Sequence, residues 1–258
     1  MPKKNSNEPA PANGGSAERT LALLALLADA GRPMSLAQLA EGLSLPKATV
    51  HRLCTLLLQG GYIAKDLGER EFVVGRALLK LSFDTLNHGT LRGSRHEVLS
   101  RLVEQVNETC NFTTLDGASV LYLDRVEAPW PWRLKLEIGT HVPLHCTASG
   151  KLFLALMPEA QRESLLASLS LQKMTERTLT TAKALRARCE QIAEAGYSLD
   201  EGEFIDGLTA IAVPVRDGEG VVRAALATHA PVSRLPKAKA LAHLPALRAA
   251  AKRMQALL

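Results

Sequence analysis

Residues 34–75 most constrain the fold of this chain, because their pattern is that of two short helices, a tight turn and a small hairpin. Ser35 can cap the first helix, and Gln38, three residues later, completes a capping box. The second helix has apolar residues at the i, i+3, i+4, i+7 spacing of one helical face, namely Val50, Leu53, Cys54 and Leu57. Two helices, a short turn and a following hairpin predict a winged helix-turn-helix.

The second helix of this segment also has the residues that a DNA-contacting helix needs. Between Ser44 and Lys65 the sequence contains three basic residues and no acidic one, which is the charge that a phosphate-facing surface requires. We expect Ser44 to cap this helix and Arg52 to be the leading DNA contact. The full set of predicted DNA contacts is Ser44, Lys47, Thr49, His51 and Arg52 around the helix, with Lys65 and Arg70 on the wing. A three-helix interaction domain that does not bind DNA is the alternative.

Length and composition bound the remaining possibilities. A chain of 258 residues predicts two domains. Residues 1–16 are rich in Pro, Asn, Gly and Ser and lack the apolar core of a signal peptide, so we expect a disordered tail. No apolar run reaches the roughly 20 residues of a membrane span. The cysteines have no paired spacing, which indicates reduced, buried thiols in a cytoplasmic protein and argues against a zinc site: Cys54, Cys110, Cys146 and Cys189. We expect no cofactor and no metal.

The rest of the chain alternates predicted strands and helices. Residues 76–90 read as a linker helix, and residues 232–258 form a basic helix with six Lys or Arg and no Asp or Glu, which we interpret as a solvated face. Strands are expected at 111–115, 120–127, 132–138, 197–200, 208–216 and 221–229. Two runs of strands separated by helices predict an α+β domain with one mostly antiparallel sheet.

Two segments of this second half resemble signature segments of the IclR-type bacterial transcriptional regulator family. The first runs from Gly139 to Ala155 and has a glycine, a proline and the pair Gly150-Lys151 at the family's spacings. The second, residues 196–215, includes Asp200 and the apolar run that follows Gly207. The winged helix-turn-helix lies where the family places it, so three separated segments agree in order over about residues 17–257.

The resemblance implies an architecture and partners. The expected domains are a winged helix-turn-helix DNA-binding domain at 17–75, a linker helix at 76–90, and a GAF-like effector-binding domain with an antiparallel sheet at 91–258. Proteins of this family form homodimers, often dimers of dimers (homotetramers), on palindromic double-stranded operator DNA. Their effectors are small molecules, often carboxylated or aromatic. The resemblance therefore implies a ligand-responsive transcriptional regulator that senses a small organic acid.

Carried over residue by residue, the resemblance implies an effector pocket around the start of a helix. The free amides of Ala148 and Ser149 would hold the effector carboxylate, since a helix N-terminus is a ready anion site. Thr147 would add a hydroxyl donor. Asp200 would accept a hydrogen bond from an effector hydroxyl, or stay protonated in a desolvated site. The complete set of expected effector contacts is Leu134, Val142, Thr147, Ala148, Ser149, Asp200, Leu208, Ala210, Ala227 and His229.

Other functions are less favoured by the residues. His145 and Cys146 suggest a base and a nucleophile, but adjacent residues of an extended segment point to opposite sides, so we expect no catalysis. Asp200, Glu203 and His229 offer metal-binding groups without a tight motif. The alternative function is an effector-free DNA-binding or interaction protein.

Overall fold

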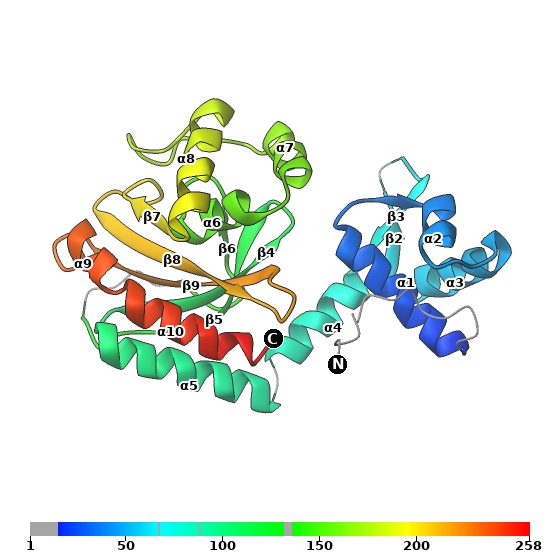
Figure 1. Cartoon of the computed structure of the whole chain (residues 1–258), viewed down its shortest axis with the longest axis horizontal. Coiled ribbons are helices and arrows are strands. Elements are labelled where there is room, and N and C mark those ends of the chain that lie inside the picture. The colour runs from blue at the N-terminus through cyan, green and yellow to red at the C-terminus, as the bar shows by residue number, and fades with distance from the viewer. Residues whose placement is uncertain (1–14, 67, 88, 132–135) are drawn as a thin grey trace, which may run out of the picture. The chain divides into compact units, whose positions relative to one another are not determined.

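The computed structural model describes residues 15–66, 68–87, 89–131 and 136–258. The chain divides into two compact units, Met1–Leu86 and Asn87–Leu258 (Figure 1). Each unit buries its own cluster of apolar side chains, so each has a hydrophobic core.

The first unit is a winged helix-turn-helix, as the sequence predicts. Its sheet has the antiparallel order β1-β3-β2, and Leu23, Val50 and Leu53 lie in its core with 0–1% exposure. The elements are α1 (Ser16–Ala30), β1 (Met34–Ser35), α2 (Leu36–Gly42), α3 (Lys47–Gln59), β2 (Ile63–Lys65), β3 (Glu71–Val74) and α4 (Arg76–Asn87).

The caps of the two central helices differ in how well the sequence predicts them. The capping box of α2 is confirmed, because the Gln38 amide donates to Ser35 Oγ at 3.3 Å and the Ser35 amide donates to Gln38 Oε1 at 2.8 Å. The cap predicted for α3 is wrong. Its N-cap residue is Pro46, without a side-chain hydrogen bond, and Ser44 has φ 53° in the turn that closes α2. The Ser44 amide donates to Glu41 O, so the residue belongs to the end of α2.

The second unit is an α+β domain, again as predicted. Its six strands form one sheet of order β6-β5-β4-β9-β8-β7, and every neighbouring pair is antiparallel. The elements are α5 (Gly89–Val106), β4 (Thr109–Asp116), β5 (Ser119–Val126), β6 (His141–Pro143), α6 (Ala148–Leu156), α7 (Glu159–Ser168), α8 (Ala182–Ala195), β7 (Ser198–Glu201), β8 (Leu208–Arg216), β9 (Val222–Pro231), α9 (Lys237–Ala242) and α10 (Leu244–Gln255).

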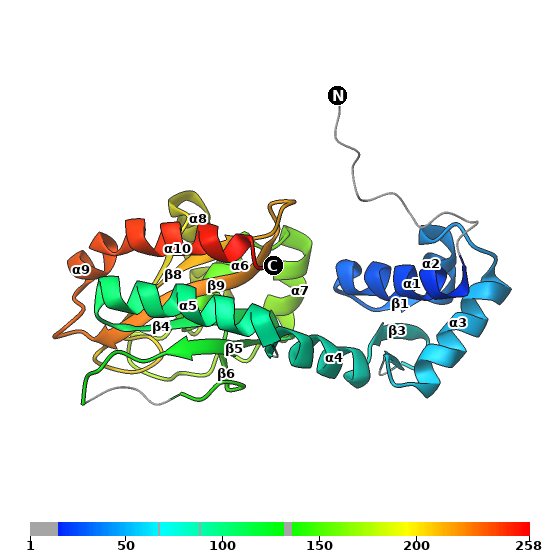
Figure 2. The same cartoon turned by 90° about the horizontal axis from the view of Figure 1, so that it is seen from below.

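Helices cover both faces of this sheet. Helices α5 and α10 pack together on one face, while α6 and α8 pack together on the other (Figures 1 and 2). Gly150, in the first turn of α6, allows this helix to approach closely, because a Cβ there would lie 2.3 Å from Leu144 O. The start of α6 is thereby held close to the segment that precedes it.

The edge strand of the sheet lies at other residues than the predicted 132–138. Residues 132–135 are outside the described residues, and residues 136–138 do not form a strand. The edge strand is instead β6, where Val142 pairs with Val120 of β5. The chain reaches it through a turn at Gly139, whose amide donates to Tyr122 O at 2.8 Å. A three-residue edge strand after a glycine turn has too short a pattern to be recognised from alternation alone.

Candidate functional site

Helix α3 presents a basic surface. Lys47, His51 and Arg52 are exposed on it, and Thr49 is half-buried, while the apolar face packs into the core of the first unit. Among the described residues, neither Lys47 nor Arg52 has a carboxylate partner. The amides at the start of α3 and these uncompensated cations form a surface suited to phosphate.

The remaining predicted DNA contacts lie at the turn and on the wing. Ser44 is exposed in the turn between α2 and α3. On the wing, Lys65 and Arg70 are exposed, and the Lys65 ammonium lies 3.7 Å from the centroid of the Phe72 ring. This cation–π contact orients the lysine along the hairpin and leaves its charge at the surface.

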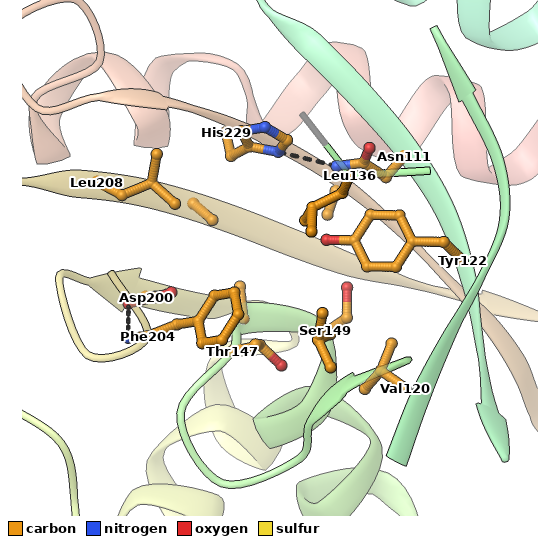
Figure 3. A pocket seen from close by; sticks show the side chains of 14 residues that line it. Asn111, Val120, Tyr122, Leu136, Thr147, Ser149, Asp200, Phe204, Leu208 and His229 are labelled. Carbon is orange, nitrogen blue, oxygen red and sulfur yellow. Dashed lines mark hydrogen bonds between the residues drawn. The ribbon is translucent and has the colours of Figure 1, made fainter. Parts of the chain in front are cut away.

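The second unit contains a cavity between the sheet and the start of α6 (Figure 3). Nine of the ten effector contacts implied by the family resemblance line it, and the tenth, Leu134, lies outside the described residues. The nine are Val142, Thr147, Ala148, Ser149, Asp200, Leu208, Ala210, Ala227 and His229. The cavity is narrow, with about 30 Å³ available to the centre of a water molecule, so it has room for only about two waters.

The first turn of α6 supplies free amides to one side of the cavity. Thr147 is the N-cap, and its hydroxyl accepts from the Gly150 amide at 3.1 Å and donates to Pro143 O at 2.7 Å. In this structure the proton of the Thr147 hydroxyl is therefore used by Pro143 O, and its role as a donor to a ligand stays a prediction. In the described part of the chain, the Ala148 and Ser149 amides have no acceptor. They are the groups at this end that an anion can use.

Asp200 lies on the same side of the cavity and is 2% exposed. Its Oδ1 accepts from the Glu203 amide at 2.7 Å and the Phe204 amide at 3.4 Å. Burial raises the pKa of Asp200 from the ordinary 3.8 to about 7, against the lowering effect of the nearby Lys151 cation. This carboxyl is thus close to half-protonated at neutral pH.

A buried ion pair lies behind Asp200. Lys151, which is 0% exposed, is bonded through Nζ to Glu203 Oε1, and Arg188 Nη1 lies 3.7 Å from the same oxygen. Desolvation lowers the pKa of Lys151, while the Glu203 carboxylate opposes this effect. The pair fixes Glu203, and with it the backbone amides that hold Asp200.

The opposite end of the cavity is a hydrogen-bonded row of polar side chains. Arg125 Nη1 donates to Asn111 Oδ1 at 3.0 Å, which directs the Asn111 amide group toward His229. Asn111 Nδ2 then lies 2.9 Å from His229 Nδ1, so Nδ1 is the acceptor and the ring proton is on Nε2 (Figure 3). Burial, with Arg125 and Arg234 nearby, lowers the pKa of His229 to about 3, so the ring is neutral. His229 is buried at 6% exposure and is not a surface imidazole.

Five further residues line the cavity that the sequence did not predict. They are Asn111, Val120, Tyr122, Leu136 and Phe204. The one usable signal was the asparagine at the start of the strand predicted at 111–115, since a buried amide needs a partner.

The residues considered for catalysis and metal binding can also be placed in the structure. His145 Nε2 is bonded to Gln172 O at 2.8 Å, and burial raises the pKa of the Cys146 thiol to about 12, which does not activate it. No group of three His, Cys, Asp or Glu side chains within the described ranges could hold a metal ion. In the same part of the chain, no helix has both the length and the apolar character to cross a membrane.

Comparison with known proteins assigns both units. Residues 16–67 match the family described as IclR helix-turn-helix domain, and residues 83–256 match the one described as Bacterial transcriptional regulator IclR C-terminal. The chain is 38% identical to the probable transcriptional regulator SauR of Cupriavidus necator, over 94% of this chain and 96% of that protein. It is 31% identical to the transcriptional repressor IclR of Escherichia coli, over 91% and 89% of the two chains.

Solved structures share the fold. A putative transcriptional regulator from Rhodococcus sp. RHA1 matches with a TM-score of 0.65 and 27% identity, over 94% of this chain and 97% of that chain. An IclR homologue from Microbacterium hydrocarbonoxydans, crystallised with 4-hydroxybenzoate, matches with a TM-score of 0.59 and 24% identity, over 95% and 99%.

Proposed function

Since this chain belongs to the IclR family of bacterial transcriptional regulators, we propose that it binds a palindromic operator through α3 and the wing, as a homodimer or dimer of dimers, and senses a small organic acid in the cavity of the second unit. The observation that carries the sensing role is the cavity itself, in which two unpaired helix-start amides face a buried, protonatable carboxyl. The proposal places the protein in the cytoplasm, where its DNA is.

DNA binding is assigned to the exposed cations of the first unit. Arg52 is the leading candidate for a DNA contact, because it is exposed on α3 opposite the buried Val50 and Leu53. Lys47 lies in the first turn, where its charge adds to that of the helix dipole. Lys65 and Arg70 would contact phosphate from the wing. A helix in the major groove reads only a few base pairs, so recognition of one operator needs two copies of the chain.

The test of this assignment is Arg52→Ala, measured by fluorescence anisotropy on the upstream intergenic DNA at several salt concentrations. A phosphate contact weakens binding to all sequences alike and lowers the salt slope by about one. A guanine contact costs about 1–3 kcal/mol on the cognate site only. The matched control is Lys80→Ala, since Lys80 is already paired with Asp84 on α4. Unchanged operator affinity in Arg52→Ala, under all salt conditions, removes Arg52 from the interface.

Self-association is assigned to the exposed leucines of the first unit. Leu21 on α1 is 66% exposed, and Leu79 and Leu81 on α4 are 51% and 54% exposed. Large apolar side chains that water surrounds favour burial against a second copy. Sedimentation of the full chain should show a dimer or tetramer, and Leu79→Glu should shift it toward the monomer. A chain that is monomeric at all concentrations, and binds DNA as a monomer, contradicts the proposal.

The chemical class of the effector is inferred from the polar groups at the two ends of the cavity. A carboxylate accepts hydrogen bonds from the Ala148 and Ser149 amides, and Asp200 joins them as a donor when it is protonated. A hydroxyl on the effector suits the other end, where Asn111 and His229 are neutral polar groups. The carbon skeleton lies against apolar walls that include Val142. A hydroxy acid, aromatic acids included, meets these conditions without an unpaired charge.

Calorimetry with matched acids and amides tests the effector class. We use 4-hydroxybenzoate, which a relative of this fold holds in its crystal structure, together with 4-hydroxybenzamide and aliphatic hydroxy and keto acids. Carboxylates should bind and their amides should not, because an uncharged amide gains little from the start of α6. Asp200→Asn should change both affinity and its pH dependence, while Asp206→Asn, at an exposed carboxyl of the same loop, should not. If only cations or uncharged molecules bind, this assignment of the cavity is wrong.

Regulation requires that the effector distinguish two states of the protein. A ligand with equal affinity for the DNA-bound and DNA-free forms shifts nothing. Operator affinity should therefore change when an acid from the panel saturates the second unit, and the acid's own affinity should change by the same factor on operator DNA. If DNA binding is strong and no acid alters it, the chain is an effector-free DNA-binding protein.

A further inference from the structure

Most residues that line the cavity are buried. Among the described residues of its wall, Leu136 and Phe204 are the two that are partly exposed. Within this part of the chain, these two side chains are therefore the candidates for a route by which a ligand enters. The cavity is also too small, as it stands, for more than about two waters, so some side chain must move before any organic acid fits.

Phe204 lines both this cavity and a second, larger hollow, the outer groove. The outer groove offers about 500 Å³ to the centre of a water molecule. The other residues of the groove come from two loops, Met174, Thr175, Glu176 and Arg177 from the first and Ile205 and Asp206 from the second. Figure 3 shows the Phe204 ring beside Thr147 and Asp200, at the amide end of the cavity.

The backbone on either side of this ring is firmly held. Thr175 Oγ1 donates to Gly202 O at 2.7 Å, and Thr178 Oγ1 donates to Glu203 O at 2.7 Å. On the inner side, Asp200 Oδ1 accepts from the Phe204 amide at 3.4 Å. Because both loops are tied in this way, rotation of the phenyl side chain opens the wall with less loss of bonding than movement of the loop.

We propose that Phe204 is the gate of the cavity: its side chain closes the passage from the outer groove and sets the size of the molecules that are admitted. This inference uses the proposed function only in taking the cavity as the ligand site. With the ring turned aside, the small cavity and the outer groove join into one space that a drug-sized acid can fill. The gate also lies beside Thr147, the N-cap of α6, so an entering carboxylate meets the start of that helix (Figure 3).

The test measures access directly and needs no effector. Ser149→Cys places a thiol on the cavity wall with almost no change of volume, and methyl methanethiosulfonate labels it at a rate that intact-mass spectrometry follows. Adding Phe204→Ala should raise this rate by about tenfold, which corresponds to about 1.4 kcal/mol in the opening equilibrium. With the larger reagent 5,5′-dithiobis(2-nitrobenzoate), the labelling rate should increase by a larger factor than with methyl methanethiosulfonate. The native thiols are buried, and Phe204→Ala without Ser149→Cys gives their background rate.

Two matched variants separate the gate from general loosening. Ile205→Ala alters the outer groove without touching the cavity, and it should leave the labelling rate unchanged. Leu136→Ala tests the other partly exposed wall. Equal rates with and without Phe204→Ala, or a larger increase from Leu136→Ala or Ile205→Ala, overturn the proposal. If Phe204→Ala does not fold, as judged by circular dichroism, Phe204→Leu must still increase the rate severalfold, and Phe204→Trp must decrease it. None of these outcomes depends on whether an acid is the effector.

Discussion

Replacing Asp200 by asparagine should make the second unit more stable at alkaline pH and have little effect at acidic pH. The carboxyl is 2% exposed, and its pKa is raised from 3.8 to about 7 because burial disfavours the charged form. The folded state therefore holds a proton that the unfolded state releases between these two values. The stability that this proton contributes is fully present below about pH 4. It is lost as the pH rises from about 4 to about 7, the pKa of the folded state. Asparagine keeps the Oδ1 acceptor for the Glu203 and Phe204 amides and removes the titration.

The size of the effect follows from the same shift. Moving a pKa from 3.8 to about 7 corresponds to about 4 kcal/mol, which is an upper limit because the ionised carboxylate can relax toward Lys151. The difference in unfolding free energy between Asp200→Asn and the unchanged chain should rise by about 1.4 kcal/mol for each pH unit between pH 4 and 7, then level off.

Urea titrations at pH 4.5 to 8.5 measure this difference. Both tryptophans of the chain lie in the sequence of the second unit. Trp130 Nε1 donates to Asn107 O at 2.8 Å and its ring lies 4.8 Å from the Arg234 guanidinium, so its fluorescence follows the unfolding of that unit. Asp206→Asn is the matched control, since it removes an exposed carboxyl of the same loop and should not show this slope. A difference for Asp200→Asn that is flat from pH 5 to 8, or that slopes the other way, would refute the reasoning about its burial.

Three further predictions use the same fluorescence or a thiol assay. Gly150→Ala should destabilise by several kcal/mol, about 2–4, because its Cβ would lie 2.3 Å from Leu144 O, whereas Gly93→Ala in α5 meets no atom within 4 Å and should be neutral or slightly stabilising. Glu203→Gln should cost about 3–5 kcal/mol, because it leaves Lys151 buried without its carboxylate, and a loss below 1 kcal/mol would show that water reaches the lysine. The four cysteines should not react with a thiol reagent until urea unfolds the chain, because burial raises their pKa values to about 11 or 12; rapid reaction of one native thiol would contradict this burial.

The elements of both units could largely be predicted from the sequence because they rest on local patterns. The capping box of Ser35 and Gln38 needs only residues three apart, and the core face of α3 needs only the helical period. Strand β8 has the bounds predicted for it, 208–216, and Gly196 ends α8 in the left-handed conformation. Such signals are contained within one turn or one strand, so tertiary contacts did not override them.

For some capping residues, the sequence pattern does not show which backbone groups the residue will bond to. Ser44 has the right residue type for an N-cap, yet the chain uses it to end α2 and starts α3 at Lys47, three residues later. Thr147 does cap α6, but its proton goes to Pro143 O, and the pattern does not show that neighbour. A hydroxyl can satisfy several backbone groups, and which of them it reaches depends on the path of the chain.

The sequence by itself determined which segments could hold an anion and an acid, and the tertiary structure alone decided the state of these groups. Asn111 bonds to His229 across 118 positions of sequence, and Lys151 pairs with Glu203 across 52. Phe204 closes the cavity only because two distant loops meet beside it. The pKa of Asp200 is raised because packing removes water from its carboxyl. Desolvation and hydrogen-bond pairing depend on atoms within a few ångströms, and folding brings those atoms together from segments that share no sequence pattern.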